Sequence, residues 1–148
     1  MDRRYFLQQS CGLCLTMLMS GWLVEELSAC SASKVLQGRL VDREIEVDGA
    51  LLNDEHFRVL AASGVRYRIA LRRLADGQYL ALLLMCTHAR NPVTLTGDSF
   101  YCPLHGSRFD AQGQVVQGPA QQPLVHLPVS RDAHGNLHIV LQNWMLES

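Results

Sequence analysis

The 148-residue chain lacks several features that would each have pointed to a class of function. Lys34 is its only lysine and the net charge is −1, so no dense basic segment is present and we expect no nucleic-acid partner. No run of about 18 uncharged apolar residues occurs, so the sequence predicts no membrane-spanning helix. Hydrophobic residues make up 48% of the chain and charged residues 18%, an average soluble composition that excludes a wholly disordered chain.

The sequence also lacks the common catalytic motifs. It has no glycine-rich phosphate-binding loop, no recognisable Ser/His/Asp arrangement and no triad for a single iron ion. It has no internal repeat, and its length is that of one ordinary domain. We therefore expect the chain not to be an enzyme on its own, and leave open a role as one subunit of an enzyme.

The first thirty residues have the layout of an export signal. Arg3 and Arg4 precede an apolar stretch over residues 11–24, the order of the basic and hydrophobic regions of secretory signals. The arginine pair followed by Phe-Leu resembles a twin-arginine export signal, which is an address and not a membrane anchor. The alternative is an amphipathic helix that stays attached, which the Gly, Ser and Glu residues of this stretch disfavour.

Residues 27–30, Leu-Ser-Ala-Cys, resemble a lipobox, in which Cys30 becomes a lipid-modified N-terminus after cleavage. The two glutamates just before this sequence depart from the usual uncharged pattern. We predict an export signal over residues 1–29, lipid attachment at Cys30 and a tether over residues 30–37. The protein is then expected on the periplasmic side of a bacterial membrane, anchored through its lipid.

The five cysteines are unevenly spread along the chain. Cys11, Cys14 and Cys30 fall in the first thirty residues, whereas Cys86 and Cys102 fall in the body. An odd total divided in this way is a poor disulfide framework. It fits a removable leader followed by a domain with two functional cysteines.

From Gly38 onward the hydrophobic pattern has a period of two, which is typical of β-strands. Residues 65–72 alternate apolar and charged side chains, Asp76-Gly77 is a hairpin signal, and residues 79–85 form an apolar run that suits a central strand. Residues 53–62 are ambiguous and allow one helical turn after an asparagine cap. Further short strands are predicted at residues 93–95, 99–101, 114–117, 124–129 and 137–141. Short strands at regular spacing predict an all-β barrel or sandwich.

Two short motifs in the body carry metal-binding side chains. Cys86 and His88 form a C-x-H pair, and Cys102 and His105 form a C-x-x-H pair. Each pair follows a strand-like run, so we expect two loops at one end of a sheet to face each other. Two thiolates and two imidazoles suit either a tetrahedral zinc ion or an iron–sulfur cluster.

These motifs resemble those of the Rieske iron–sulfur proteins, which are C-x-H, a spacer and C-x-x-H-G. Residues 102–110, Cys-Pro-Leu-His-Gly-Ser-Arg-Phe-Asp, are similar to the second cluster-binding loop, and residues 86–91 take the place of the first. Residues 118–124 resemble the proline loop that covers the cluster. The resemblance implies a Rieske domain over residues 38–142, a small antiparallel β-sandwich or barrel with an inserted cluster-binding subdomain. A C-terminal tail over residues 143–148 follows it.

The resemblance also implies one 2Fe-2S cluster of Rieske type. Cys86 and Cys102 would bind one iron as thiolates, and His88 and His105 would bind the other as neutral imidazoles. Because two neutral ligands replace two thiolates, an added electron is less unfavourable, and potentials lie at about −150 to +300 mV, against about −400 mV for plant-type ferredoxins. The outer nitrogens of the two histidines are expected to face solvent or a partner.

Several positions distinguish the chain from high-potential Rieske proteins. Asn91 and Leu104 stand where those proteins carry a second cysteine in each loop, so no disulfide can join the loops. Ser107 is retained, and its hydroxyl is expected to donate a hydrogen bond to the cluster or, alternatively, to bond the local backbone. Phe109 replaces the usual tyrosine, which removes one donor and leaves its ring to the core. We expect a lower reduction potential than in disulfide-containing members.

Together these features predict a one-electron carrier between membrane-associated redox partners outside the cytoplasm. The expected partners are a cytochrome, a quinol-oxidising enzyme or a molybdenum enzyme, and the lipid on Cys30 provides the membrane contact. One alternative is the iron–sulfur subunit of a membrane oxidoreductase, such as a quinol-oxidising complex or an arsenite oxidase. A more distant alternative is a zinc-stabilised binding module, which would be colourless.

The remaining candidate side chains are given no role in the cluster site. The arginines within residues 65–73 are interpreted as a solvated face, with a docking patch as the alternative. Trp144 is expected to pack the C-terminal tail. The histidines that match no motif position are interpreted as surface or structural residues: His56, His126, His134 and His138.

Overall fold

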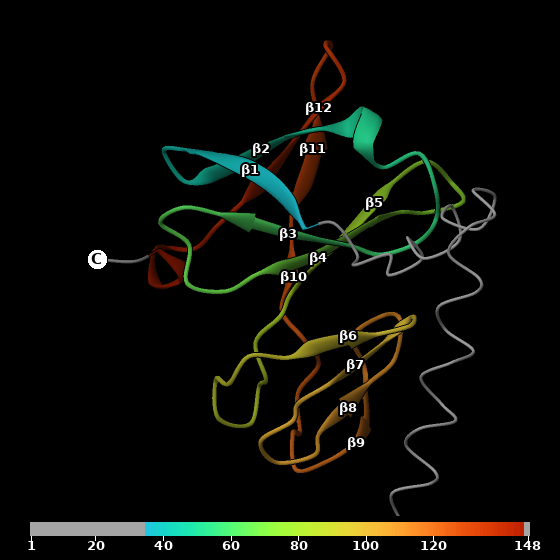
Figure 1. The fold of residues 1–148 in the computed structure, drawn as a ribbon, viewed down its shortest axis with the longest axis vertical. Coiled ribbons are helices and arrows are strands. Elements are labelled where there is room, and N and C mark those ends of the chain that lie inside the picture. The colour runs from blue at the N-terminus through green and yellow to red at the C-terminus, as the bar shows by residue number, and fades with distance from the viewer. Residues whose placement is uncertain (1–34, 147–148) are drawn as a thin grey trace, which may run out of the picture. The chain divides into compact units, whose positions relative to one another are not determined.

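The computed structural model describes residues 35–146. The predicted export signal, the lipid-attachment site Cys30 and most of the predicted tether lie outside these residues. Strands dominate the described part (Figure 1), and its only helical elements are two 3-10 turns, η1 (Gly49–Leu51) and η2 (Asn143–Met145). Neither of these is long and apolar enough to span a membrane. The all-β prediction is confirmed.

The larger of two sheets contains eight strands. They are β1 (Leu36–Val41), β2 (Glu44–Asp48), β3 (Arg58–Ala62), β4 (Ile69–Arg73), β5 (Tyr79–Leu83), β10 (His126–Leu127), β11 (Val129–Arg131) and β12 (Asn136–Val140). Their order in the sheet is β10-β5-β4-β3-β1-β2-β12-β11, and every neighbouring pair is antiparallel except β1 and β3. Because the outermost strands β10 and β11 are separated in the chain only by Pro128, the sheet is a nearly closed barrel.

Aspartate and glycine form the turns between several strands. At the β4–β5 hairpin the Asp76 carboxylate accepts the Gln78 N–H at 2.9 Å, and Gly77 has a φ of +83°. A carboxylate that bonds the backbone two residues on, and a glycine in the left-handed region, both favour a tight turn. The hairpin predicted at Asp76-Gly77 is confirmed by the pairing of β4 with β5.

Strands β4 and β5 are buried on both faces. Ile69 and Leu71 belong to the core inside the barrel, whereas Ala70 and Leu82 belong to a second core on the outer face. Successive side chains of a strand point to opposite faces, so a strand covered on both sides needs apolar residues throughout. This double burial explains the uninterrupted apolar run over residues 79–85.

A second, four-stranded antiparallel sheet forms a smaller subdomain, drawn in yellow and orange in Figure 1. Its strands are β6 (Thr94–Thr96), β7 (Ser99–Tyr101), β8 (Arg108–Phe109) and β9 (Val115–Gln117). Phe100 and Phe109, each 1% exposed, pack in the second core with Leu82 of the large sheet. The Phe100 ring also meets Phe57 edge-on, with centroids 5.1 Å apart. Aromatic packing therefore fixes the smaller subdomain against the barrel.

The strand predicted over residues 65–72 begins only at Ile69. The Arg66 N–H donates to the Met145 carbonyl at 3.1 Å, and Val65 forms a bridge with Leu146. The C-terminal segment thus takes the backbone partners that a longer β4 would have used.

Two smaller predictions are wrong in detail. The helical turn allowed within residues 53–62 lies earlier, at Gly49–Leu51, and Asp48 caps it by accepting the Ala50 N–H. Trp144 is 41% exposed, whereas the next residue, Met145, is fully buried and anchors the tail. The turn lies earlier because the carboxylate of Asp48, directly before it, caps its first turn. The tail is anchored by Met145 because an unbranched methionine side chain fits the barrel end more readily than an indole.

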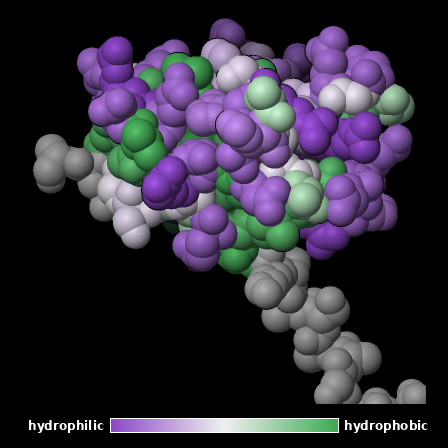
Figure 2. Space-filling view, turned by 90° about the horizontal axis from the view of Figure 1, so that it is seen from above, coloured by the Kyte–Doolittle hydropathy of each residue, from purple (hydrophilic) through white to green (hydrophobic). Residues whose placement is uncertain are grey.

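Hydrophilic residues cover most of the large-sheet end of the molecule, with smaller hydrophobic areas between them (Figure 2). Among residues 35–146, the two most exposed large hydrophobic side chains belong to the other end, Leu104 at 63% and Val116 at 67%. Single exposed hydrophobic residues are common on soluble domains and need no partner to explain them.

Candidate metal centre

The two Cys/His motifs lie in two hairpin loops of equal length. Met85 bridges Pro92 across residues 86–91, and Tyr101 pairs with Arg108 across residues 102–107. These segments are referred to below as loop 1 (86–91) and loop 2 (102–107). Each loop begins with its cysteine directly after a paired residue, so the sheet edge fixes where both thiols start.

Loop 1 is closed by its own backbone. The Cys86 N–H donates to the Asn91 carbonyl at 2.7 Å, and the Cys86 carbonyl accepts the Arg90 N–H at 2.8 Å. Arg90 has a φ of +54°, a left-handed conformation that is unfavourable for a residue with a Cβ. The Tyr67 hydroxyl donates to the Arg90 carbonyl at 2.8 Å and holds this residue in place.

Loop 2 repeats the same backbone pattern. The Cys102 N–H donates to the Ser107 carbonyl at 2.9 Å, and the Cys102 carbonyl accepts the Gly106 N–H at 3.0 Å. Gly106, the fifth residue of the loop as Arg90 is of loop 1, has a φ of +82°. The two cysteines therefore occupy equivalent positions in two equivalent loops.

Both cysteine thiols are free and fully buried. Cys86 and Cys102 are each 0% exposed and pack in the second core among apolar side chains that include Phe100 and Phe109. An apolar shell of this kind limits solvent access to metal-bound sulfur and tunes its redox properties.

The two imidazoles lie at the surface and touch each other. His88 of loop 1 and His105 of loop 2 are exposed, and their ring centroids are 4.9 Å apart with the planes at 86°. The structure thus brings the two loops together, as the sequence predicted. The four candidate ligands divide into two buried thiols and two exposed imidazoles.

The predicted proline loop, residues 118–124, is hydrogen-bonded to both metal loops. The Thr87 hydroxyl of loop 1 donates to the Gln122 carbonyl at 2.6 Å. The Ala120 N–H donates to the Ser107 hydroxyl oxygen of loop 2 at 3.0 Å. Since neither loop carries a second cysteine, these two bonds join the loops to a common third segment without a disulfide.

Ser107 combines full burial with a free donor. It is 0% exposed, and its hydroxyl oxygen accepts the Ala120 N–H. Among the described residues, no hydrogen bond donated by this hydroxyl to a protein group is found. A buried hydroxyl that lacks an acceptor is unfavourable by about 1–3 kcal/mol, so a cluster sulfur at this position would satisfy it.

The donor set of the two loops fits a 2Fe-2S cluster of mixed ligation. Such a cluster takes two thiolates at one iron and two imidazoles at the other. The loops supply two thiols and two imidazoles, with a buried hydroxyl donor beside them. Within residues 35–146, no three His, Cys, Asp or Glu side chains group closely enough to hold one metal ion.

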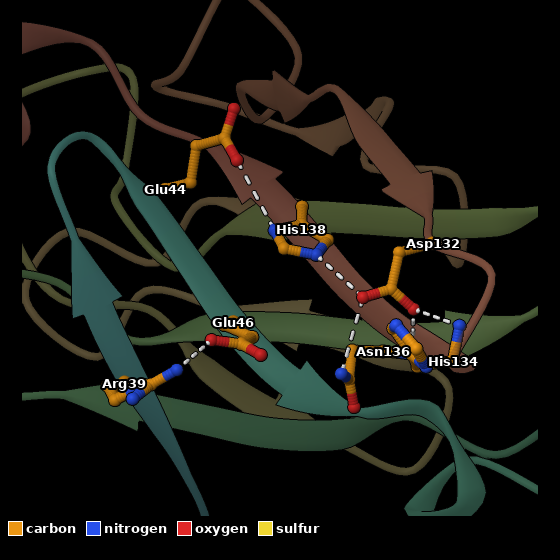
Figure 3. A network of polar contacts seen from close by, with 7 residues as sticks. All are labelled: Arg39, Glu44, Glu46, Asp132, His134, Asn136 and His138. Carbon is orange, nitrogen blue, oxygen red and sulfur yellow. Dashed lines mark hydrogen bonds and ion pairs between the residues drawn. The ribbon is translucent and has the colours of Figure 1, made fainter.

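Outside the site, His138 is the centre of a polar network on the large sheet (Figure 3). Its Nε2 lies 3.3 Å from Asp132 Oδ2, and its Nδ1 lies 3.3 Å from Glu44 Oε2. The hydrogen bond with Asp132 raises the pKa of His138 above its ordinary value of 6.5, although desolvation opposes the rise. Desolvation alone would raise the pKa of Asp132, but hydrogen bonds from His138, Asn136 and the His134 backbone lower it to about 2. His138 is a structural residue, in keeping with its interpretation from the sequence.

Sequence reasoning missed two residues that shape the site. Thr87 joins loop 1 to the proline loop, and its type carries no signal for that contact. Arg90 takes the left-handed position that glycine takes in loop 2. Aligning the loops from their cysteines, Cys-Thr-His-Ala-Arg with Cys-Pro-Leu-His-Gly, would have shown this equivalence.

Comparison with known proteins agrees with this geometry. The family model of the Rieske 2Fe-2S domain matches residues 28–131. The cytochrome b6-f complex iron-sulfur subunit 2 of Trichormus variabilis is 46% identical over 63 residues, which cover 41% of this chain and 31% of the relative. The mitochondrial Rieske subunit of the Gallus gallus cytochrome b-c1 complex is 32% identical over 83 residues, covering 54% and 26%. The chain thus matches less than a third of the length of these relatives.

A solved structure of naphthalene 1,2-dioxygenase with indole bound is similar with a TM-score of 0.50 and 18% identity, over 64% of this chain and 25% of that one. A likeness at this identity shows a shared fold. The family match itself covers well over half of the chain and contains both metal loops. The chain therefore belongs to the Rieske family and carries one 2Fe-2S cluster.

Proposed function

We propose that this Rieske protein is a one-electron carrier whose cluster is bound by Cys86, Cys102, His88 and His105. The observation that carries the proposal is the pair of equivalent loops, which bury two thiols and expose two touching imidazoles. When bound, the cluster takes up and releases a single electron. The proline loop positions both metal loops, and Ser107 is placed to donate a hydrogen bond to the cluster.

The buried and exposed ligands have different tasks in this proposal. Cys86 and Cys102 hold iron away from water, so the apolar core influences the potential. His88 and His105 reach the surface, where a partner protein can approach the cluster.

We place the reduction potential below that of disulfide-containing Rieske proteins. Asn91 and Leu104 replace the disulfide, and Phe109 is a core residue that brings no hydroxyl. Ser107 is the remaining hydroxyl donor, and it stabilises the reduced cluster without binding iron. Fewer donors to the sulfur atoms stabilise the reduced state less, which lowers the potential.

The cellular setting is proposed from the sequence. Residues 1–29 act as the export signal, Cys30 carries the lipid, and residues 30–37 link it to a Rieske domain over 38–142. The carrier then exchanges electrons with a cytochrome, a quinol-oxidising enzyme or a molybdenum enzyme at the periplasmic side of the membrane. Its relatives named as subunits of the cytochrome b6-f and b-c1 complexes support a membrane-associated partner.

The names of these relatives also favour a second candidate function. In it, the chain is a permanent iron–sulfur subunit of a membrane oxidoreductase. Purification of the full chain from its native membrane in mild detergent separates the two. A stable complex with a cytochrome or a molybdenum subunit would support the subunit, and recovery of the chain alone would support the carrier.

Ligand variants test the site itself. We expect Cys86→Ser and His88→Ala each to lose the visible absorption of the cluster and the bound iron. His134→Ala is the matched control, because His134 is exposed and lies outside both loops, and it should keep both. For the intact protein, an anaerobic titration should take up one electron per chain. Retention of the full iron content by both ligand variants would contradict the assignment.

A further inference from the structure

Two arginines in the segment before β4 lie close to the end of loop 1. Arg66 and Arg68 are exposed and line a cleft of about 330 Å³ that runs alongside Pro92, the residue that closes loop 1. The other residues that line it are Tyr67, Leu84, Val93 and Thr94. The cleft therefore has two cationic side chains and no carboxylate.

Close contacts join this arginine segment to loop 1 and to the C-terminal turn. The Tyr67 hydroxyl donates to the Arg90 carbonyl, which holds the arginine segment against loop 1. The Arg66 N–H donates to the Met145 carbonyl, next to Trp144. The Arg90 guanidinium lies 5.6 Å from the centre of the Trp144 ring, which is 41% exposed. Arg66, Arg68, Arg90 and Trp144 are referred to below as the arginine surface.

The charges of the arginine surface are not neutralised by the rest of residues 35–146. The arginine ion pairs found in this part of the chain lie elsewhere, at Arg39 with Glu46 and at Arg58 with Asp54. Three arginines, two that line the cleft at Pro92 and one in loop 1, thus have no acidic partner among the described residues. Like charges that are close together repel, and an acidic surface placed against them relieves that repulsion.

We propose that the arginine surface docks an acidic face of the protein that exchanges electrons with the cluster. The inference rests on the proposed electron-transfer function, to which it adds the charge of the partner and the side from which it approaches. Arginine and tryptophan are the residues most enriched among those that dominate binding energy at interfaces. The surface includes Arg90 of loop 1, the loop that also carries the exposed His88, so a partner seated on it would lie at that loop.

The test uses the full chain with its cluster, reduced with dithionite and freed of excess reductant. It is mixed by stopped flow with two acceptor proteins, acidic plastocyanin and basic mitochondrial cytochrome c. One electron leaves the reduced cluster and converts Cu(II) to Cu(I) or haem Fe(III) to Fe(II). We expect the plastocyanin rate to fall between about 0.01 M and about 0.1 M salt, as the screening length drops from about 30 Å to about 10 Å. The cytochrome c rate should not fall.

A charge-removing variant locates the effect. At low salt, Arg66→Gln/Arg68→Gln, which leaves Arg90 of loop 1 in place, should slow the plastocyanin reaction about tenfold and flatten its salt dependence, without slowing cytochrome c. The control is Arg73→Gln/Arg131→Gln, which removes two exposed arginines outside the arginine surface. Its rates should match those of the wild type, and the cluster spectrum should be unchanged in both variants.

Three results would overturn the docking proposal. The first is a plastocyanin rate that is independent of salt, and the second is equal slowing by the two variants. The third is loss of binding to phosphatidylglycerol vesicles in the Arg66→Gln/Arg68→Gln variant with no change in the plastocyanin rate, which would assign the surface to the membrane. A cluster that dithionite reduces but that passes no electron to either acceptor would instead contradict the proposed function.

Discussion

Replacing Thr87 by valine tests the idea that the proline loop joins the two metal loops in place of a disulfide. The substitution keeps the branched shape of the side chain and removes only the hydroxyl that donates to the Gln122 carbonyl. A net hydrogen bond contributes about 0.5–1.5 kcal/mol, and a partly solvated one lies in the lower half of that range. A loss of about 1 kcal/mol corresponds to about a fivefold larger population of the open proline loop.

The consequence of a more open proline loop is faster loss of iron. We expect Thr87→Val to lose its visible absorption about fivefold faster than the wild type when an iron chelator is present in excess. Amide hydrogen exchange at Ala120 should speed up by a similar factor, because its N–H lies in the same segment. The free energy of global unfolding should fall by no more than this same amount of about 1 kcal/mol, since Thr87 lies outside both apolar cores.

Thr94→Val is the matched control for this experiment. Thr94 is exposed on β6, and no side-chain hydrogen bond from it is found among the described residues. The control should lose iron at the wild-type rate. Equal rates for Thr87→Val and Thr94→Val would refute the role of the Thr87–Gln122 bond in holding the site closed.

Three further substitutions probe separate parts of the protein. Ser107→Ala should lower the reduction potential in a redox titration, because it removes the buried hydroxyl donor of loop 2. An unchanged potential would leave Ser107 as a backbone-bonding residue only. Because the pKa of His138 is raised in the folded state, the protonated imidazole stabilises the fold below pH 6.5. This contribution is lost as the pH rises through the folded-state pKa. The Tm of the wild type should therefore fall above pH 6.5 by more than the Tm of His138→Gln. The Asp132 carboxylate keeps its stabilising contribution above pH 3.8, its ordinary pKa. That contribution is lost as the pH falls from 3.8 toward the lowered pKa of about 2. Phe100→Ala should destabilise the fold by about 3–5 kcal/mol in chemical denaturation, since the ring fills the second core, and a loss below about 1 kcal/mol would contradict that packing.

The sequence predicted the parts of the fold that depend on local chemistry. Asp76-Gly77 indicated a hairpin because an aspartate and a left-handed glycine suit few other structures, and the structure has one there. The all-β class followed from alternation along the chain, which is also a local property. The start of β4 could not be predicted in this way, because it depends on the Arg66 contact with Met145, a residue far away in the chain.

In the candidate site, too, the features set by local sequence could be predicted and those set by distant contacts could not. Cys86, His88, Cys102 and His105 are visible in the sequence because ligand types and spacings are local. The pairing of the loops through the proline loop depends on Thr87, whose partner lies 35 residues away. The parallel pairing of β1 with β3 is likewise non-local and has no sequence signature. The charge network at His138 was missed because its carboxylates come from different strands and turns.

The most direct test of the central claim is an electron paramagnetic resonance spectrum of the dithionite-reduced full chain, combined with metal analysis. The mixed Cys/His ligation of Cys86, Cys102, His88 and His105 predicts a rhombic signal whose average g value is lower than that of all-cysteine 2Fe-2S ferredoxins, with two irons per chain. A colourless protein that gives no signal and holds one zinc per chain would contradict the electron-transfer account.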